Sequence, residues 1–272
     1  IEESAGLFNI GLEGILLFGA LAGALGAQAS GSALVGLFTG MGVGALIGLV
    51  FGTISTSLRG SQLISGVGIN LLALGFVALM LSVMGAPGFH SVAREVQVPL
   101  IPLGVGNLSP LVPITVAIAI GVWWLLRRTQ LGIWIRAVGE NPAAADVAGI
   151  RVNRVRLGAA VAAGVLAGLA GAYLSIDWFG AVTKEITAGR GFIALAIVVF
   201  SGLNPLLALL GGFIFGFFDG LATWVATYPG IKDIIPWQFV AMMPYVVTLA
   251  VVAGMIGRVR FPSALGVPYL RE

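Results

Sequence analysis

The sequence contains no cysteine and only one histidine, His90, among its 272 residues. Disulfides and thiolate metal sites are therefore excluded. A metal site normally needs several ligands, so His90, alone in a proline-rich segment, is expected to be a surface residue. With one histidine and no cysteine, the sequence offers no nucleophile–histidine–acid set. There is also no Gly-x-x-x-x-Gly-Lys-Ser/Thr loop, so we expect neither ATP binding by this chain nor any cofactor.

Charge is scarce as well. Charged residues make up 9% of the chain and hydrophobic residues 58%, whereas a soluble domain carries about 25% charge. A chain with so little polar surface is expected to be surrounded by lipid rather than by water. The net charge of +3 does not indicate a nucleic-acid partner, because the basic residues are scattered among apolar segments. The composition therefore predicts an all-α, polytopic transmembrane helix bundle, and we expect residues 1–272 to form one transmembrane domain.

Apolar segments long enough to cross a membrane, which takes roughly 20 residues, recur along the chain. Eight segments are candidates: 10–27, 33–56, 62–85, 111–127, 156–177, 190–203, 205–227 and 238–257. The sixth is too short to span comfortably. It is either half of a broken helix or one arm of a hairpin with the seventh, turned at Gly202–Pro205.

The lysines and arginines set the expected orientation. With the polar loop 128–155 in the cytoplasm, ten of the 14 basic residues fall on the cytoplasmic side and four outside. An excess of Lys and Arg marks cytoplasmic loops. The chain is therefore expected to be a multi-pass inner-membrane protein with both ends inside and a long outer loop at 86–110.

Glycine is abundant, with 41 residues, and part of it recurs every fourth position. The repeats are Gly40, Gly44, Gly48 and Gly52; Gly164 and Gly168; and Gly212, Gly216 and Gly220. Such spacing keeps glycines on one helix face and lets another helix approach closely. Packing within one subunit is the simpler interpretation, and a subunit interface or sliding surface is the alternative.

Polar residues inside apolar segments are candidates for a translocation pathway. Asp219 shares a helix face with Gly212, Gly216 and Thr223, and ionisable groups at membrane depth usually face a cavity or a partner. It is either a pathway residue or a structural acid. The Asn70 amide suits a ligand, but an interhelical hydrogen bond explains it more simply.

Two further polar residues lie near the start of the first segment, in the run NIGLEG. These are Asn9 and Glu13. For Glu13 we expect a contact with the membrane interface, a helix terminus or a coupled partner, and no catalytic role.

The cytoplasmic stretch 136–156 carries the clearest local signals. Asn141 is a favoured helix N-cap, and Pro142 follows at the first helical position. Ala143, Ala144 and Ala145 favour helix, Asp146 lies near the positive helix end, and Gly149 is a natural stop. These signals predict a helix of about two turns. It has too little apolar surface to be stable alone, so a partner is expected to pack on its alanine face and to pair with Glu140 and Asp146. The alternative is a solvated loop.

Three runs resemble a known family: NIGLEG (9–14), AVGENPAAADVAGI (137–150) and GFIALAIVVFSGLNPLLALLGG (191–212). They are similar to permeases of ABC importers for nucleosides and simple sugars, within the wider ribose and branched-chain amino-acid permease group. The resemblance implies that Gly139, Glu140, Asn141, Pro142, Ala145, Asp146 and Gly149 form the ATPase-coupling helix. It also implies three partner proteins besides membrane lipid: a cytoplasmic ABC ATPase, a second homologous permease subunit and an extracytoplasmic substrate-binding lipoprotein.

The implied function is ATP-driven import by alternating access, with hydrolysis on the partner rather than on this chain. The resemblance favours nucleosides over sugars. Family members usually carry another apolar segment before NIGLEG, so the native subunit is expected to have more spans than this chain. The alternatives are an ion-coupled secondary transporter, a branched-chain amino-acid permease, and an intramembrane enzyme with Asp219 as an acid.

Overall fold

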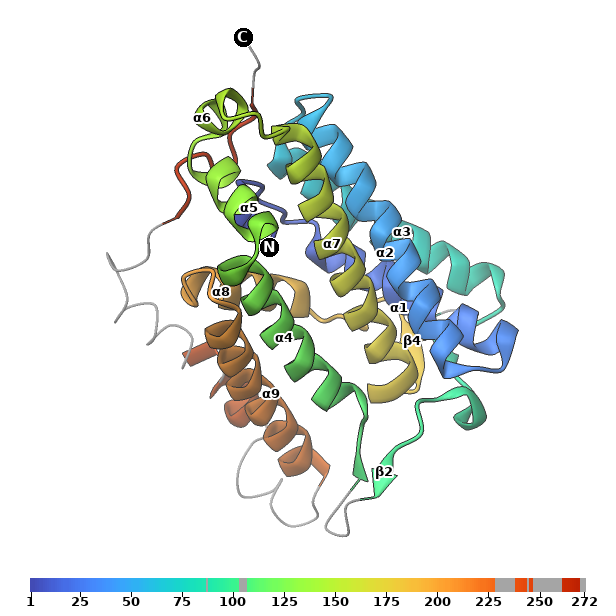
Figure 1. Ribbon diagram of the computed structural model, residues 1–272. Helices are drawn as coiled ribbons and strands as arrows, with labels where there is room; N and C mark the ends of the chain where they lie inside the picture. The colour runs from blue at the N-terminus through green and yellow to red at the C-terminus, as the bar shows by residue number, and fades with distance from the viewer. Residues whose placement is uncertain (87, 103–106, 228–237, 244, 247–260, 270–272) are drawn as a thin grey trace. The chain divides into compact units, whose positions relative to one another are not determined.

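The computed structural model describes residues 1–86, 88–102, 107–227, 238–243, 245–246 and 261–269 (Figure 1). It divides into two compact units, each considered by itself below. Residues 1–193 and 262–272 form the first, and residues 194–261 form the second. The single permease domain expected over 1–272 stays a prediction.

Helices dominate both units. In the described residues six are long and apolar enough to cross a membrane: α1 (Leu12–Ser30), α2 (Ala33–Thr56), α3 (Gln62–Val83), α4 (Leu111–Arg128), α7 (Val152–Tyr173, extended by a π-helical turn, Leu174–Trp178) and α9 (Pro205–Thr227). Shorter helices are α5 (Gln130–Glu140), α6 (Pro142–Val147), α8 (Arg190–Phe200) and the 3-10 turns Glu3–Ala5 and Arg94–Val96. The strands are β1 (Phe89–Ser91), β2 (Ile101–Pro102), β3 (Asn107–Leu108) and β4 (Ala181–Thr183).

The predicted all-α polytopic bundle is confirmed, but the count of about eight spans is not. The segment predicted at 190–203 forms α8, which has 11 residues and is too short to cross. A turn at Gly202 and Leu203, both with φ of 60°, leads from it into α9. A Cβ on Gly211 would lie 2.8 Å from Ile197 Cγ2, so the two helices form the predicted hairpin. Most of the last predicted segment, 238–257, lies outside the described residues.

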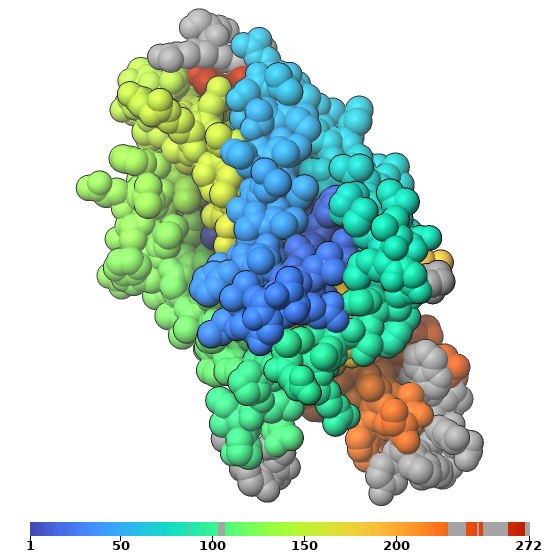
Figure 2. Space-filling model, turned by 90° about the vertical axis from the view of Figure 1, so that its right-hand side faces the viewer, coloured from blue at the N-terminus to red at the C-terminus, as the bar shows by residue number. Residues whose placement is uncertain are grey.

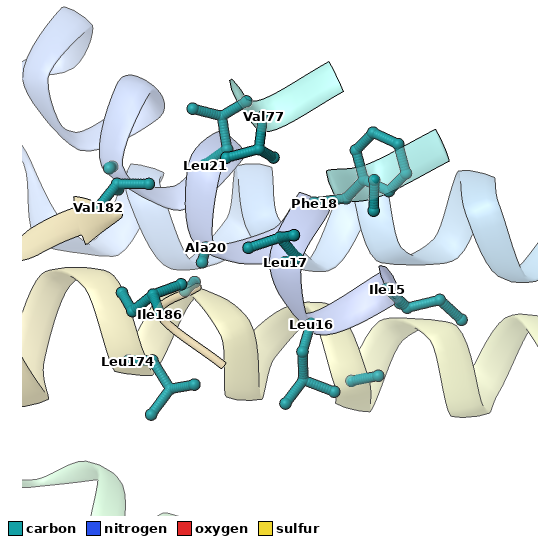
Figure 3. Close-up of a cluster of buried hydrophobic side chains, with 14 of the residues drawn as sticks. Ile15, Leu16, Leu17, Phe18, Ala20, Leu21, Val77, Leu174, Val182 and Ile186 are labelled. Atoms are coloured by element: carbon teal, nitrogen blue, oxygen red, sulfur yellow. The ribbon is translucent and has the colours of Figure 1, made fainter. Parts of the chain in front are cut away.

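The core of the first unit surrounds α1. Ile15, Leu17 and Leu21 of this helix are at most 4% exposed. Figure 3 shows Phe18 and Leu21 on the side of Val77 from α3, and Leu16 on the opposite side, toward α7. A surface helix has one apolar stripe, whereas a helix that is apolar all round is buried. The sequence of α1 is apolar all round, which is why it lies inside the bundle.

The glycine repeats bring α2 and α7 into backbone contact. A Cβ on Gly44 would lie 2.7 Å from Gly168 Cα, and one on Gly48 would lie 2.5 Å from the Ala160 carbonyl oxygen. Close packing within the subunit is therefore confirmed for the repeats at 40–52 and 164–168. Among the described residues, a Cβ at Gly212, Gly216 or Gly220 would meet no atom within 4 Å, and the role of the third repeat stays a prediction.

Apolar side chains also cover the outside of α2 and α3, which lie side by side in Figure 2. Phe38 and Leu46 of α2 are 67% and 56% exposed, and Ile64 and Leu71 of α3 are 75% and 65% exposed. An apolar surface of this extent is unfavourable in water and favourable against hydrocarbon or an apolar partner. This face therefore fits the membrane environment that the composition predicts.

The outer loop is attached to the bundle by a small sheet. β1 pairs antiparallel with β4, with His90 opposite Val182. The ring nitrogen Nε2 of His90 lies 2.7 Å from Gln28 Oε1, near the end of α1. The expected surface histidine is thus half-buried and holds this loop to the bundle.

Candidate functional site

The short helix predicted in the cytoplasmic loop is present as α6. The Oδ1 atom of Asn141 accepts a hydrogen bond from the Ala144 N–H at 3.0 Å, and Pro142 occupies the first turn. Gly149 follows the helix with φ of 86°, a conformation that few side chains tolerate. The cap, the proline and the stop are confirmed, and the helix ends at Val147.

One side of α6 is used by the chain itself. Ala145 is 4% exposed and packs with Val138 of α5 and Val152 of α7. Gly139 is buried where an added Cβ would meet the Ser4 carbonyl oxygen. On this side α6 therefore packs on the rest of the chain through Ala145, and a contact of Gly139 and Ala145 with an ATPase stays a prediction.

The other side of α6 is open. Its exposed apolar residues are Ala143, Ala144, Val147 and Ala148, and Val147 is 92% exposed. An exposed apolar patch at the tip of a polar loop is a candidate interaction surface. We call these four residues the α6 face.

The helix that precedes α6 was not predicted, although the sequence holds its signals. Thr129 caps α5, since its Oγ1 accepts from the Gly132 N–H at 3.2 Å. Gly132 is needed there because a Cβ would meet the carbonyl oxygens of Leu125 and Leu126, at the end of α4. Together α5 and α6 make a compact corner, with Ile135 and Val138 buried.

Glu140 and Asp146, which were predicted to pair with a docking protein, both lie close to other residues of this chain. The Glu140 carboxylate is exposed, and its Oε1 accepts from Ser263 Oγ at 2.9 Å. Half-buried Asp146 lines a cavity of about 480 Å³ beside α6. The same cavity is lined by Arg151, Arg154 and Tyr269. The exposed arginines place positive charge next to the α6 face.

Arg156 holds this corner to both ends of the described chain. It is 1% exposed, although it lies at the end of the polar cytoplasmic stretch 136–156. Its Nε donates to the Ala5 carbonyl at 3.1 Å, Nη1 to the Val267 carbonyl at 2.9 Å and Nη2 to the Ala264 carbonyl at 3.4 Å. The Ala264 N–H in turn donates to the Gly139 carbonyl at 3.0 Å. A buried charge is tolerated when it is hydrogen-bonded in this way.

Replacing Arg156 by lysine is expected to loosen both terminal segments while the charge is retained. A guanidinium offers five N–H donors in a fixed fork, whereas an ammonium is a compact group on a flexible stem. Hydrogen–deuterium exchange in residues 3–8 and 262–269 should rise by roughly tenfold, for the loss of one or two hydrogen bonds of about 1 kcal/mol each. The matched control is Arg154→Lys, at an exposed position of the same helix, which should leave exchange unchanged. Equal exchange in the two variants would contradict the structural role of Arg156.

The first unit also contains polar contacts at the depth where α1 begins. A Cβ on Gly11 would lie 3.1 Å from Gly66 Cα, and one on Gly14 would lie 2.9 Å from Asn70 Cα. Gly66 and Asn70 are the fifth and ninth residues of α3. At ~1.5 Å per residue, α1 therefore starts roughly 6–12 Å along α3 from its N-terminal end. Leu7 and Asn9, in the non-helical run before α1, are fully buried.

Asn70 connects α3 to the start of α1. Its Oδ1 accepts from the Gly14 N–H at 2.7 Å, and its Nδ2 donates to the Ile10 carbonyl at 3.0 Å. The side chain is 9% exposed. These are the interhelical hydrogen bonds that offered the simpler explanation, and they leave the amide occupied by the chain. A pathway role for Asn70 stays a prediction.

Asn9 forms hydrogen bonds with the buried carboxyl group of Glu2, in the non-helical run before α1. Its Nδ2 donates to both Glu2 carboxylate oxygens at 3.3 Å. Burial, together with the nearby Glu3 carboxylate, raises the pKa of Glu2 well above its usual value, and the Asn9 hydrogen bond opposes that shift. Asn9 also accepts the Gly11 N–H on Oδ1 at 2.8 Å. It therefore shapes the entry into α1.

Glu13 contacts a helix terminus, one of its three expected partners. Its Oε1 accepts from the Gly189 N–H at 2.8 Å and its Oε2 from the Gly191 N–H at 2.6 Å. These groups form the N-terminal end of α8, where unpaired N–H groups and the helix dipole favour a carboxylate. A Cβ on Gly191 would lie 2.5 Å from Glu13 Cα, so glycine permits the approach. Glu13 thus holds the first residues of α8 to α1 within the first unit.

Asp219 and Thr223 lie on α9, in the second unit. The Thr223 Oγ1 donates to the Asp219 carbonyl at 2.9 Å, one turn earlier. Thr223 is exposed and Asp219 is half-buried. Their pathway role stays a prediction. Among the described residues, no group of three His, Cys, Asp or Glu side chains could hold a metal ion.

Comparison with known proteins gives full-length matches. Residues 1–256 match the family described as branched-chain amino acid transport system / permease component. The chain is 32% identical to the nucleoside ABC transporter permease protein NupC of Lactococcus lactis, over all of this chain and 90% of NupC. It is 34% identical to the guanosine ABC transporter permease protein NupQ of Bacillus subtilis, over 99% of this chain and 90% of NupQ. It is 32% identical to the putative glucose ABC transporter permease protein TsgC13 of Haloferax volcanii, over all of this chain and 92% of TsgC13. No solved structure matches significantly.

Family membership identifies the chain as a transport component rather than an enzyme, and it implies work with an ATPase and a substrate-binding protein. The apolar helices agree with a multi-pass inner-membrane protein. With the match spanning most of its length, the chain belongs to the permease family of branched-chain amino acid transport systems and is the permease component of an ABC transporter.

Proposed function

We propose that the chain is the permease subunit of an ATP-driven importer of nucleosides, and that its α6 face receives the movement of the ATPase. The observation that carries the coupling role is the α6 geometry. A capped helix presents four exposed small or apolar residues, including Val147 at 92%, while Ala145 fixes it from behind. Arg151 and Arg154 beside it suit an acidic rim on the partner.

The route from this face into the bundle follows contacts within the first unit. Ala145 packs on Val152 at the start of α7. α7 then runs against α2 through the glycine contact and against α1, where a Cβ on Gly19 would lie 2.7 Å from Gly168 Cα. α1 in turn holds the first residues of α8 through Glu13. Since the α5–α6 corner is packed against α7, a push on α6 is expected to move α7 and α1 with it. Coupling further requires that this assembly have two discrete arrangements.

Two full-length relatives carry nucleoside or guanosine names and one a glucose name, which supports nucleosides as the substrate class. The second permease subunit, the lipoprotein nature of the binding protein and contacts with lipid are part of the proposal. The test is uptake of radiolabelled guanosine and uridine by proteoliposomes that contain the complete transporter, with glucose and leucine as comparison substrates. We expect nucleoside uptake only when ATP is present in the same compartment as the ATPase. Glucose or leucine uptake would reassign the substrate, and uptake driven by an ion gradient without ATP would overturn the mechanism.

Replacing Val147 by glutamate is expected to uncouple the transporter and leave the fold intact. A charge forced into an apolar contact without a partner is costly, so ATP-driven uptake should fall roughly tenfold or more. Val147 is a better position for this test than Ala145, since a large residue at Ala145 would disturb Val138 and Val152. The control is Val147→Ala, which should retain uptake within about twofold. Membrane insertion and thermal stability should be equal for both. Normal coupled uptake by Val147→Glu would remove α6 as the docking element.

A further inference from the structure

A second cavity lies at the cytoplasmic end of α3, away from α6 and from the Glu13 contact. Its volume is about 650 Å³. The α2–α3 turn forms one wall, and the segments before α1 and at the end of the described chain form the other. The lining residues are Phe8, Arg59, Gly60, Ser61, Gln62, Leu63, Leu265, Gly266 and Pro268. All belong to the first unit.

Gln62 leaves a buried donor in this wall. It is 3% exposed, and its Oε1 accepts from the Phe8 N–H at 2.6 Å. Because the Phe8 N–H is a donor, the Gln62 amide oxygen must face it, and the Gln62 NH₂ group must therefore point away from Phe8 N. This Nε2 has no hydrogen-bond partner among the described residues. A buried donor without an acceptor is unfavourable and calls for an explanation such as a bound group.

Positive potential gathers at the same wall. Ser61 is the N-cap of α3, and Gln62 and Leu63 are its first two residues. The first N–H groups of a helix have no partner within it, and the helix dipole adds partial positive charge there. The exposed Arg59 supplies a full charge and a guanidinium fork. This set of donors matches a phosphate group.

The remaining walls are apolar. Phe8, Leu265 and Pro268 line the cavity opposite the charge. Leu63, Val67, Leu71 and Leu74 are 52%, 47%, 65% and 44% exposed, and their spacing of three and four puts them on one face of α3. An apolar stripe thus leads from the cavity along the helix toward the membrane interior.

We propose that this cavity binds an anionic phospholipid of the cytoplasmic leaflet. The phosphate accepts from Gln62 Nε2, from the first N–H groups of α3 and from Arg59, and an acyl chain follows the α3 stripe. The arginine distribution places the α2–α3 turn on the cytoplasmic side, where anionic headgroups meet basic pockets. A soluble phosphate would leave the apolar wall and the stripe unused.

A lipid at this position would also hold together the two segments that line it. The Gly266 N–H donates to the Gly6 carbonyl at 3.0 Å. A Cβ on Gly139 would lie 3.2 Å from the Gly6 nitrogen. The bound lipid would therefore support the base of the α5–α6 corner.

Native mass spectrometry of the purified full chain, supplied with equal amounts of phosphatidylglycerol and phosphatidylcholine, tests the proposal without any transport assay. The wild type is expected to retain phosphatidylglycerol preferentially. Gln62→Glu keeps an oxygen for the Phe8 N–H but replaces the free donor by a negative acceptor. Arg59→Gln removes the charge. Both variants should retain roughly tenfold less phosphatidylglycerol, as expected for loss of a charge-assisted bond.

Two variants provide matched controls. Gln130→Glu makes the same change at the first residue of α5, and Arg128→Gln removes an exposed arginine at the end of α4. Both should retain phosphatidylglycerol as the wild type does. Equal loss in Gln130→Glu would reduce the effect to general surface charge, and unchanged retention in Gln62→Glu would overturn the site. Displacement of the lipid by millimolar inorganic phosphate, or a protein crosslinked to the α3 stripe in its place, would overturn the lipid assignment.

Discussion

Replacing Glu13 by alanine is expected to destabilise the protein by roughly 1–3 kcal/mol and to abolish uptake. The change leaves the partly buried Gly189 and Gly191 N–H groups without their acceptor, and the two together should cost about as much as one fully buried unpaired donor. Lipid supplies no replacement acceptor. The thermal midpoint of the purified protein and nucleoside uptake by proteoliposomes measure the two effects.

The control for this variant lies in the segment that leads to α8. Glu185 is exposed, so Glu185→Ala should change stability by less than about 0.5 kcal/mol. Glu13→Gln keeps one acceptor oxygen and should fall between the wild type and Glu13→Ala. If Glu13→Ala and Glu185→Ala behave alike, the carboxylate does not hold α8.

The second large effect is expected at Gly44. Gly44→Ala would place a methyl group against the backbone of α7, 2.7 Å from Gly168 Cα and 2.9 Å from its nitrogen. Backbone on both sides cannot move aside, so the helices must separate, and overpacking of this kind costs about 1–3 kcal/mol. The free energy of unfolding in mixed micelles should fall accordingly.

Gly42 provides the matched control, two residues away on the same helix. It is exposed, and a Cβ there would meet no described atom within 4 Å. Because alanine favours helix over glycine, Gly42→Ala should raise stability by up to about 1 kcal/mol. The two substitutions thus have opposite expected signs. Equal destabilisation by both would mean that glycine serves α2 through flexibility and not through the contact with α7.

Local patterns predicted the local structure well. The α6 signals at Asn141, Pro142 and Gly149 act within one helix turn of their position, and each was confirmed. The glycine spacing of α2 and α7 identified contact faces because it depends only on helix periodicity. All six long spans follow from apolar runs: α2 and α9 have the predicted ends, and the ends of the other four shift by up to about four residues.

The features that local patterns could not give depend on contacts between distant segments. The burial of Arg156 could not be predicted from its own segment, because the carbonyl groups that bind it come from residues 5, 264 and 267. Ala145 is as small as its exposed neighbours, and only the packing of α5 and α7 selects it for the interior. The partners of Glu13 and Asn70 likewise lie 176 and 56 residues away in the sequence. The α5 helix is the exception, because its Thr129 cap was visible in the sequence.

The Glu13 cap also bears on how the protein is made. Glu13 is synthesised 178 residues before Gly191, its second donor. At about 5–20 residues per second, the ribosome needs roughly 9–36 s to reach that donor. During this interval α1 has entered the translocation machinery while its carboxylate still lacks the partner that completes the fold. Biogenesis of this protein should therefore include a late step, in which α1 settles only after the nascent chain has passed residue 191.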